Sequence, residues 1–273
     1  MPTAIRGFFS SHATRYNAAR NFSGVIAMLK GLFFDMGGTL YSYRNLGELT
    51  LVLLDDFAGR HRLEHDTSTL LKHYSAGSKK ADHHLANKPF YLFREYFEII
   101  YGAMLEESRL HHLKQDFDWF VQRQTELFIG QMILKENVHD VLAQLRAKKL
   151  YMSIVSNVDE DQFHPLLTRG DLPKWFDHCT SSESARSCKP DDRFFQVALE
   201  KSGLAPNEVL FIGDSLEQDI MGADKAGMHT VLISEAKGEA PMHIGRNTEV
   251  QPDYRITDLG ELIGIVDELM AAR

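Results

Sequence analysis

Two aspartates in this sequence each stand at the end of a short apolar run and beside glycine. Asp35 follows Leu-Phe-Phe and precedes Met-Gly-Gly-Thr, while Asp214 follows Val-Leu-Phe-Ile-Gly and is closely followed by Asp219. Such runs are typical of strands buried on both faces. The carboxyl ends of parallel strands share one edge of a sheet, where open α/β sheets bind ligands. Three carboxylates gathered there would repel one another, so the pattern favours a cation among them.

Two further polar pairs would lie at the same edge. Ser156-Asn157 ends a stretch that begins at Tyr151, and Lys189-Pro190 precedes a helical pattern. Oxygen ligands together with a phosphate suit Mg²⁺, which binds through one or two carboxylates and keeps several waters. Lys189 would add a positive charge. The sequence therefore predicts a site for Mg²⁺ and a small phosphorylated molecule.

The elements that must position these residues alternate between helix and strand from Glu136 onwards. This alternation predicts a parallel sheet covered by helices on both faces, a doubly wound α/β fold. We expect strands at 32–34, 151–156, 178–182, 209–212 and 230–233. We expect helices at 138–149, 159–168, 191–202, 217–226 and 259–270.

A helical segment interrupts this alternation. Apolar residues recur at helical spacing from Leu46 to Phe57, and aromatic residues follow the same spacing up to Ile129. We assign residues 42–132 to an all-helical cap domain, and 29–41 together with 133–273 to the α/β core.

The first 28 residues differ from the rest. No acidic residue precedes Asp35, and Arg6, Arg15 and Arg20 lie among serine and small residues. This composition resembles an organellar transit peptide. Because Met28 directly precedes the first strand and offers an alternative start, we favour a disordered extension over residues 1–28. We expect a cytoplasmic protein rather than organellar targeting by residues 1–27.

Composition disfavours several other classes of protein. With 44% hydrophobic and 25% charged residues, the chain is typical of a globular protein. A net charge of -8 disfavours a nucleic-acid surface, and no apolar run approaches the ~20 residues of a membrane span. The two cysteines form no CxxC pair and fit a reducing compartment. We expect neither a nucleic-acid nor a membrane partner.

The sequence resembles the haloacid dehalogenase (HAD) superfamily in four ordered motifs: Asp35-Met-Gly-Gly-Thr39, Ser156-Asn157, Lys189-Pro190, and Gly213-Asp214-Ser215 with Asp219. The helical segment lies between the first two motifs, as in members of subfamily I with a C1-type cap. The resemblance covers about residues 29–270 and implies a Rossmann-like core with an inserted helical cap.

The resemblance also implies a role for each motif. Asp35 would be the nucleophile and form an aspartyl-phosphate, which divides one difficult displacement into two easier ones. Ser156 would bind the phosphoryl oxygens, and Lys189 would neutralise charge. Asp35, Asp214 and the carbonyl of Gly37 would hold Mg²⁺, with support from Asp219.

The remaining motif residues would contact the substrate. By the same resemblance, the residues expected to bind it are Gly38, Thr39, Ser156, Asn157 and Lys189.

One position departs from the pattern of the phosphatases in this superfamily. They usually carry a second Asp where this sequence has Gly37, and that Asp protonates the leaving group and then activates water. General acid–base help is typically worth ~10²–10⁴-fold. The residues that could substitute are Tyr41, Tyr43, Asp159 and Glu160.

The leading hypothesis is a Mg²⁺-dependent hydrolase of a small phosphorylated metabolite. Gly37 motivates an alternative, a degenerate member that binds a phosphorylated ligand or a protein and turns over weakly or not at all. Carbon–halogen hydrolysis is disfavoured because true dehalogenases need no metal, whereas Asp214 and Asp219 are both present. A phosphonate hydrolase would need a cap lysine, for which the candidates are Lys72, Lys79, Lys80 and Lys88.

Overall fold

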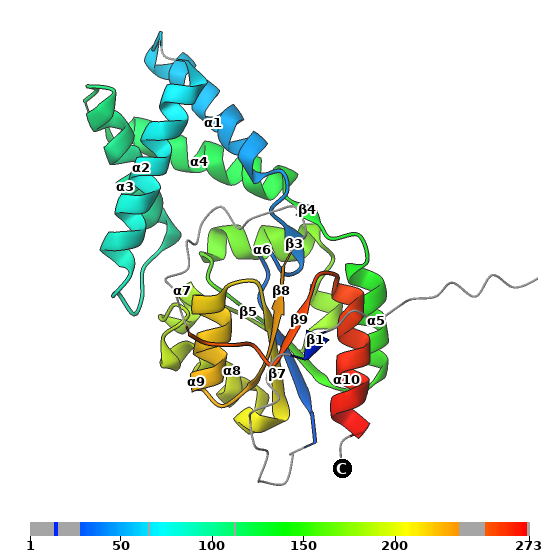
Figure 1. Cartoon of the computed structure of the whole chain (residues 1–273). Coiled ribbons are helices and arrows are strands. Elements are labelled where there is room, and N and C mark those ends of the chain that lie inside the picture. The colour runs from blue at the N-terminus through cyan, green and yellow to red at the C-terminus, as the bar shows by residue number, and fades with distance from the viewer. Residues whose placement is uncertain (1–13, 16–27, 65, 112, 235–248, 272–273) are drawn as a thin grey trace, which may run out of the picture.

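The computed structural model describes residues 14–15, 28–64, 66–111, 113–234 and 249–271. Its centre is a seven-stranded sheet of order β1-β9-β8-β7-β2-β5-β6, in which all neighbouring strands are parallel except β1 and β9 (Figure 1). The strands are β1 (Thr14–Arg15), β2 (Gly31–Phe34), β5 (Tyr151–Ser156), β6 (His178–Ser181), β7 (Val209–Gly213), β8 (His229–Ile233) and β9 (Tyr254–Ile256). This topology confirms the predicted doubly wound α/β fold.

Helices cover both faces of the sheet because its central strands are apolar on both sides. In β2, Leu32 and Phe34 pack into one hydrophobic cluster and Phe33 into the other, and all three are fully buried. The first cluster includes side chains of α5 (Val138–Ala147), α6 (Glu160–Arg169) and α10 (Leu262–Ala271). The second includes side chains of α8 (Asp192–Ser202) and α9 (Gly222–Lys225). The shorter helical turns are η1 (Pro173–Trp175), α7 (Ser182–Ala185), η2 (Pro206–Glu208), η3 (Leu216–Met221) and η4 (Leu259–Glu261).

The helical insert consists of α1 (Leu46–His61), α2 (Thr67–Leu85), α3 (Phe93–Glu107) and α4 (Lys114–Gln131). It lies beyond the carboxyl edge of the sheet in Figure 1. The chain leaves the core through β3 (Tyr41–Ser42) and returns through β4 (Ile133–Leu134), and these two strands pair antiparallel. The aromatic residues of the insert form its core: Phe57, Tyr101 and Phe120 lie with ring centroids 5.2 to 6.2 Å apart.

Contacts with two core loops hold the start of α3 against the core. The buried carboxylate of Asp159 accepts the backbone N–H groups of Phe93 (2.9 Å) and Arg94 (3.1 Å). The backbone N–H of Cys188 donates to the carbonyl of Pro89 at 2.7 Å. Burial raises the pKa of Asp159 to about 6. Both core loops also carry site residues, so the insert is positioned by the same segments that build the site.

Several elements were not expected from the sequence. The strands β1, β3, β4 and β9 have only two or three residues each, too few to show a periodic pattern. The helix expected at 217–226 begins as a π-helical turn, η3, before α9 continues it. Part of the extension assigned to 1–28 also forms structure, since Thr14–Arg15 pairs with β9. Residues 1–13 and 16–27 lie outside the described residues, so their disorder and targeting stay predictions. No helix in the described part of the chain is long and apolar enough to cross a membrane.

A close approach of α2 and α3 at Gly77 gives a test of packing in the insert. A Cβ added at Gly77 would lie 2.9 Å from Cα and 3.0 Å from the carbonyl oxygen of Ile100, whereas one at Gly102 meets no atom within 4 Å. We expect Gly77→Ala to lower the free energy of unfolding by about 1 kcal/mol or more, because the helix backbones must separate. Gly102→Ala is the matched control and should raise it by about 0.5–1 kcal/mol. Urea unfolding of both variants measures the difference, and equal effects would contradict this account of the packing.

Candidate active site

Asp35 lies directly after β2, in the middle of the sheet, with its backbone N–H bonded to the carbonyl of Ile212 at 2.8 Å. Two side chains from neighbouring segments meet its Oδ1 atom. The hydroxyl of Ser156, at the end of β5, donates to it at 3.0 Å, and the Lys189 ammonium lies at 2.6 Å. All three side chains are buried. The strand order β7-β2-β5 therefore brings together the residues expected to act as nucleophile, phosphate ligand and cation.

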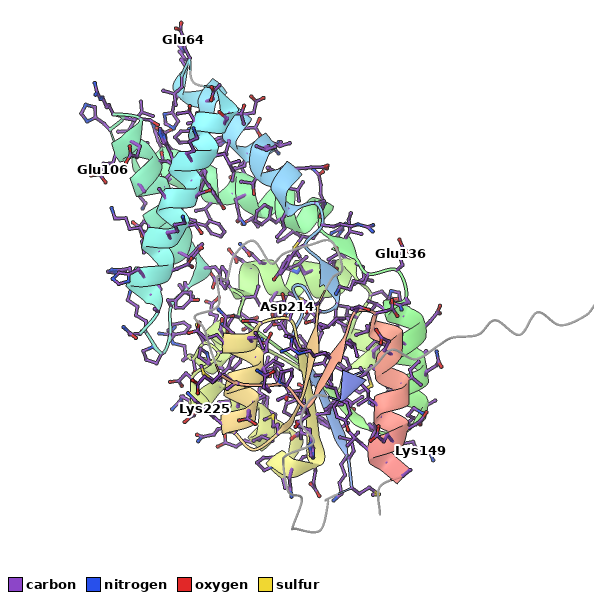
Figure 2. All side chains as sticks on the ribbon, viewed as in Figure 1. Glu64, Glu106, Glu136, Lys149, Asp214 and Lys225 are labelled. Atoms are coloured by element: carbon purple, nitrogen blue, oxygen red, sulfur yellow. The ribbon has the colours of Figure 1, made fainter. Side chains whose placement is uncertain are left out.

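The three aspartates gather around one point. Asp35, Asp214 and Asp219 each offer a carboxylate oxygen, and these atoms lie within 4.8 Å of one another. Figure 2 places Asp214 at the edge of the sheet that faces the insert. Asp219 lies in the π-helical turn, where its Oδ2 accepts the backbone N–H of Ser215 at 2.9 Å.

Glycines make room for these carboxylates. A side chain at Gly38, which has a left-handed φ of 72°, would overlap the carboxylate of Asp214, and one at Gly213 would overlap that of Asp219. A largely buried set of oxygen donors from several carboxylates suits a hard divalent cation such as Mg²⁺. The residues present therefore fit the expected metal.

Electrostatics in this cluster are dominated by burial. Burial raises the pKa of Asp35 to about 6, and the charge of Lys189 opposes that rise. Burial, together with the charges of Asp219 and Asp35, raises the pKa of Asp214 well above its ordinary value. Burial by itself would lower the pKa of Lys189, but the adjacent Asp219 and Asp35 outweigh it and raise that pKa. The lysine is thus a permanent cation, while two of the carboxyls bind protons more tightly than exposed ones do.

Lys189 is held in place through its own backbone. Asn157 accepts the backbone N–H of Lys189 at 2.8 Å and donates its amide to the carbonyl of Lys189 at 3.0 Å. The ammonium then bridges Asp35 and Asp219, with 2.6 Å to each carboxylate. Asn157 was expected to bind substrate, and that role stays a prediction. In the structure, the hydrogen bonds of Asn157 fix the position of Lys189.

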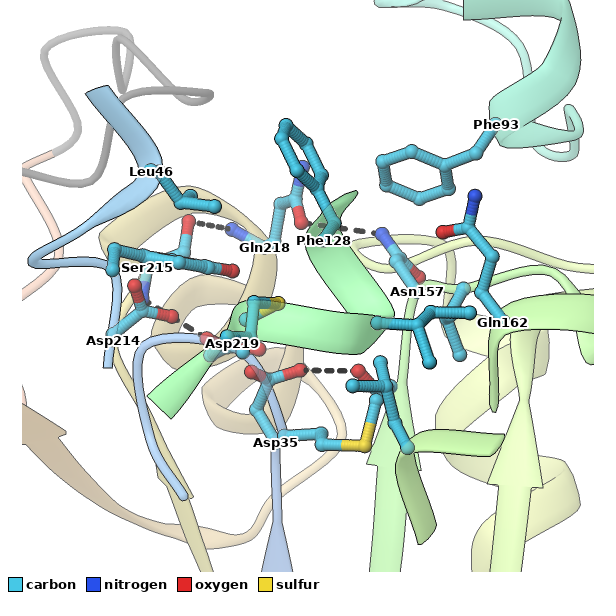
Figure 3. A pocket seen from close by; sticks show the side chains of 18 of the residues that line it. Asp35, Leu46, Phe93, Phe128, Asn157, Gln162, Asp214, Ser215, Gln218 and Asp219 are labelled. Atoms are coloured by element: carbon cyan, nitrogen blue, oxygen red, sulfur yellow. Dashed lines mark hydrogen bonds between the residues drawn. The ribbon is translucent and has the colours of Figure 1, made fainter. Parts of the chain in front are cut away.

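A pocket opens above Asp35, between the core and the insert (Figure 3). Of the expected site residues, Asp35, Gly37, Ser156, Asn157, Asp214 and Asp219 line it. Gly38, Thr39 and Lys189 are not among the described lining residues, and Lys189 lines a neighbouring pocket instead. The Thr39 hydroxyl is buried without a hydrogen-bond partner in the described part of the chain. Their substrate-binding role remains a prediction.

The opposite wall of the pocket was not foreseen. In Figure 3, Leu46, Phe93 and Phe128 of the insert lie across from the carboxylates. Three glutamines also line the pocket, and one of them, Gln218, accepts the amide of Asn157 at 3.2 Å. Gln218 stands between Asp214 and Asp219 in the sequence, so its place within the fourth motif was the available signal. The insert residues gave only a helical core pattern, which does not reveal which side chains face a ligand.

These features define a site built around a buried aspartate at the carboxyl edge of a doubly wound α/β sheet. A family model described as haloacid dehalogenase-like hydrolase matches residues 65–233. The chain belongs to this family, because the match spans more than half of the length of the chain. The resemblance expected from the motifs is therefore confirmed.

Individual relatives agree with this assignment. The chain is 24% identical over 246 residues to ribulose-1,5-bisphosphate 5-phosphatase of Halopiger xanaduensis, a match that covers 88% of this chain and 100% of that protein. It is 32% identical over 134 residues to glyceraldehyde 3-phosphate phosphatase of Methanopyrus kandleri, covering 49% of this chain and 56% of the relative. Among solved structures, the magnesium-bound putative HAD-hydrolase YfnB of Bacillus subtilis superposes with a TM-score of 0.70 at 21% identity, covering 88% of this chain and 100% of that one. This last likeness concerns the fold.

The raised carboxyl pKa values predict how metal binding depends on pH. A cation must displace the protons that Asp35 and Asp214 hold, so binding should release protons and weaken as the pH falls through about 6. Calorimetric titration with MgCl₂ at about pH 5.5 and about pH 7.5, in buffers of different ionisation enthalpy, measures both effects. Asp214→Asn should release fewer protons. Equal affinity at the two pH values would contradict the assignment.

Proposed function

We propose that this protein is a Mg²⁺-dependent phosphohydrolase that forms a phospho-aspartate on Asp35. One observation carries the proposal: a buried aspartate lies 2.6 Å from a buried lysine and within 4.8 Å of two further carboxylates. A nucleophilic carboxylate, a fixed cation and a divalent-metal site are the parts that phosphoryl transfer requires. The two relatives described above are named as phosphatases, which supports the same reaction class.

The proposed reaction has two chemical steps. A carboxylate oxygen of Asp35 bonds to phosphorus while the ester P–O bond breaks and the leaving oxygen takes a proton. Water then attacks phosphorus, and its departing proton goes to a base while phosphate leaves and Asp35 is restored. Ser156 and Lys189 hold the carboxylate in one orientation and accompany the charge of the phosphoryl group. Bound Mg²⁺ would supply further charge neutralisation, held by Asp35, Asp214 and the carbonyl of Gly37 with support from Asp219.

Removing the nucleophile tests this mechanism. Asp35→Asn should lower turnover of any phosphate-ester substrate by at least about 10³-fold, because an amide does not form the covalent intermediate. Asp192→Asn, at an exposed position of α8, is the matched control and should keep full activity. Steady-state kinetics with 4-nitrophenyl phosphate and Mg²⁺, together with thermal melts of each variant, provides the measurement. Undiminished hydrolysis by a folded Asp35→Asn protein would overturn the proposal.

Gly37 favours a second candidate function, a protein that binds a phosphorylated ligand without efficient turnover. Its site would retain the cation and the metal ligands but would lack a carboxylate two positions after Asp35. The two candidates differ in one measurement. If the wild-type protein binds Mg²⁺ and a phosphate ester in calorimetry but releases no phosphate, the result supports the binding function over the phosphohydrolase.

The wall formed by the insert suggests a class of substrate. It is mainly apolar, and the described lining contains no Lys, Arg or His side chain. An anionic group on the leaving alcohol would therefore lose its hydration without gaining a cationic partner. We infer a monophosphate ester whose leaving group is uncharged and partly apolar.

Two matched substrates test this inference about the leaving group. We expect phenyl phosphate to be hydrolysed with a kcat/KM at least about tenfold above that of 4-carboxyphenyl phosphate, which differs by one charge, since an unpaired buried charge costs at least ~1.4 kcal/mol. Competition kinetics with both esters in one reaction measures the ratio. A preference for the carboxylated ester would show that the pocket supplies a cation that this structure does not place there.

A further inference from the structure

The space beside Gly37 is occupied by another residue. A Cβ built on Gly37 would overlap the hydroxyl of Tyr43 and lie 2.9 Å from its Cζ and 3.2 Å from its Cε1. A Cβ on Gly38 would lie 2.9 Å from Cε2 of the same ring. The phenol of Tyr43 therefore lies against the Gly37–Gly38 backbone, and its hydroxyl stands where a side chain at position 37 would begin.

This arrangement, rather than backbone conformation, explains the glycine at position 37. The described glycines with a left-handed φ are Gly38, Gly203 and Gly227, so Gly37 adopts a conformation open to other residues. A larger residue at position 37 would require the ring of Tyr43 to move. Gly37 and Tyr43 thus act as a pair, in which the loss of one side chain makes room for the other.

Short elements fix Tyr43 in this position. It follows β3 directly, and β3 pairs with β4 through Tyr41 opposite Leu134 and Ser42 opposite Ile133. The half-buried Tyr43 then lines the same pocket as Asp35. The paired strand end therefore fixes the backbone at Tyr43, and this places the hydroxyl at the site.

The other three candidates for an acid lie outside the pocket above Asp35 and make structural contacts. The Tyr41 hydroxyl is buried and donates to the carbonyl of Leu166 at 2.8 Å. Asp159 accepts two backbone N–H groups of the insert, and Glu160 bonds to Ser181 and lies 2.6 Å from His164. None of these three lines the pocket above Asp35.

Resting on the proposed phosphohydrolase function, we propose that the Tyr43 hydroxyl donates the proton to the leaving group. As the ester P–O bond breaks, the leaving oxygen takes the phenolic hydrogen of Tyr43. The resulting phenolate then takes a proton from the water that attacks the phospho-aspartate. One water is consumed, and alcohol and phosphate are released with Tyr43 and Asp35 restored. A positioned general acid of this kind typically contributes ~10²–10⁴-fold.

The first experiment removes only the hydroxyl. In Tyr43→Phe, kcat/KM for an alkyl ester such as butyl phosphate should fall by about tenfold or more, because an alkoxide needs the proton, while 4-nitrophenyl phosphate should be little affected. The dependence of rate on leaving-group pKa should steepen across a series of aryl and alkyl esters. Tyr151→Phe, which removes a half-buried hydroxyl at the start of β5, is the matched control and should leave both rates unchanged.

The second experiment exploits the pairing of positions 37 and 43. Gly37→Asp alone should lower the melting temperature, since the new side chain overlaps Tyr43. Gly37→Asp combined with Tyr43→Ala removes the overlap and supplies a carboxylate in the vacated space. This double variant should hydrolyse butyl phosphate about tenfold or more faster than Tyr43→Ala, as a replacement acid would. This rescue would show that the space vacated by Tyr43 serves an acid, and the Tyr43→Phe measurement shows whether Tyr43 itself is that acid.

The outcomes separate this proposal from the one on which it rests. An active wild type whose Tyr43→Phe variant keeps the same ratio of alkyl to aryl turnover overturns the role of Tyr43 and leaves the phosphohydrolase intact. A folded wild type that releases no phosphate from any ester in the series overturns both. Selective loss on the alkyl ester, with rescue in the double variant, supports both.

Discussion

The shared ammonium of Lys189 is the interaction on which the site depends. It bridges two buried carboxylates at 2.6 Å each, and without it Asp35 and Asp219 would face each other as like charges in a poorly hydrated interior. The desolvation of each ion is costly, and the geometry compensates only because all three groups are fixed. The fold supplies that fixation through strand ends, the backbone bonds of Asn157 and the π-helical turn.

Charge compensation in the cluster is incomplete, and the excess negative charge favours the binding of a cation. Three carboxylates gather around one lysine. Burial raises the pKa of Asp35 and of Asp214, and the charge of Asp219 adds to both rises. A divalent cation would relieve the same repulsion. The repulsion among the carboxylates, which destabilises the cluster by itself, therefore favours the binding of a metal. A bound cation would also favour the binding of a phosphate dianion in a cavity lined by acidic residues.

The insert and the core are coupled through the segments that carry the site. Asp159 follows Ser156-Asn157 closely and holds the start of α3, while Cys188 precedes Lys189 and bonds to the loop before α3. These contacts link the apolar wall of the pocket, which the insert forms, to the polar residues around Asp35. Exclusion of water above Asp35 would strengthen each electrostatic interaction there, and in this way the insert would support the proposed chemistry.

The sequence alone determined the fold class and much of the site. Apolar runs that end at Asp35 and Asp214 identified strands whose carboxyl ends meet, because parallel strands share one edge whatever packs around them. The position of Lys189-Pro190 before a helical pattern added a cation at the same edge, and the structure brings Lys189 to Asp35. Such predictions succeed where the signal is local or belongs to a motif of fixed order.

Only the tertiary structure decided what stands beside the glycine at position 37 and what faces Asp35 across the pocket. Tyr43 reaches Gly37 because β3 pairs with β4, a strand from the far side of the helical insert. Phe93 and Phe128 face the site because contacts with core loops orient the insert. A helical pattern shows that one face is apolar, but it does not show which part of that face packs and which lines a cavity. That choice is made by contacts between residues distant in sequence, which no local pattern encodes.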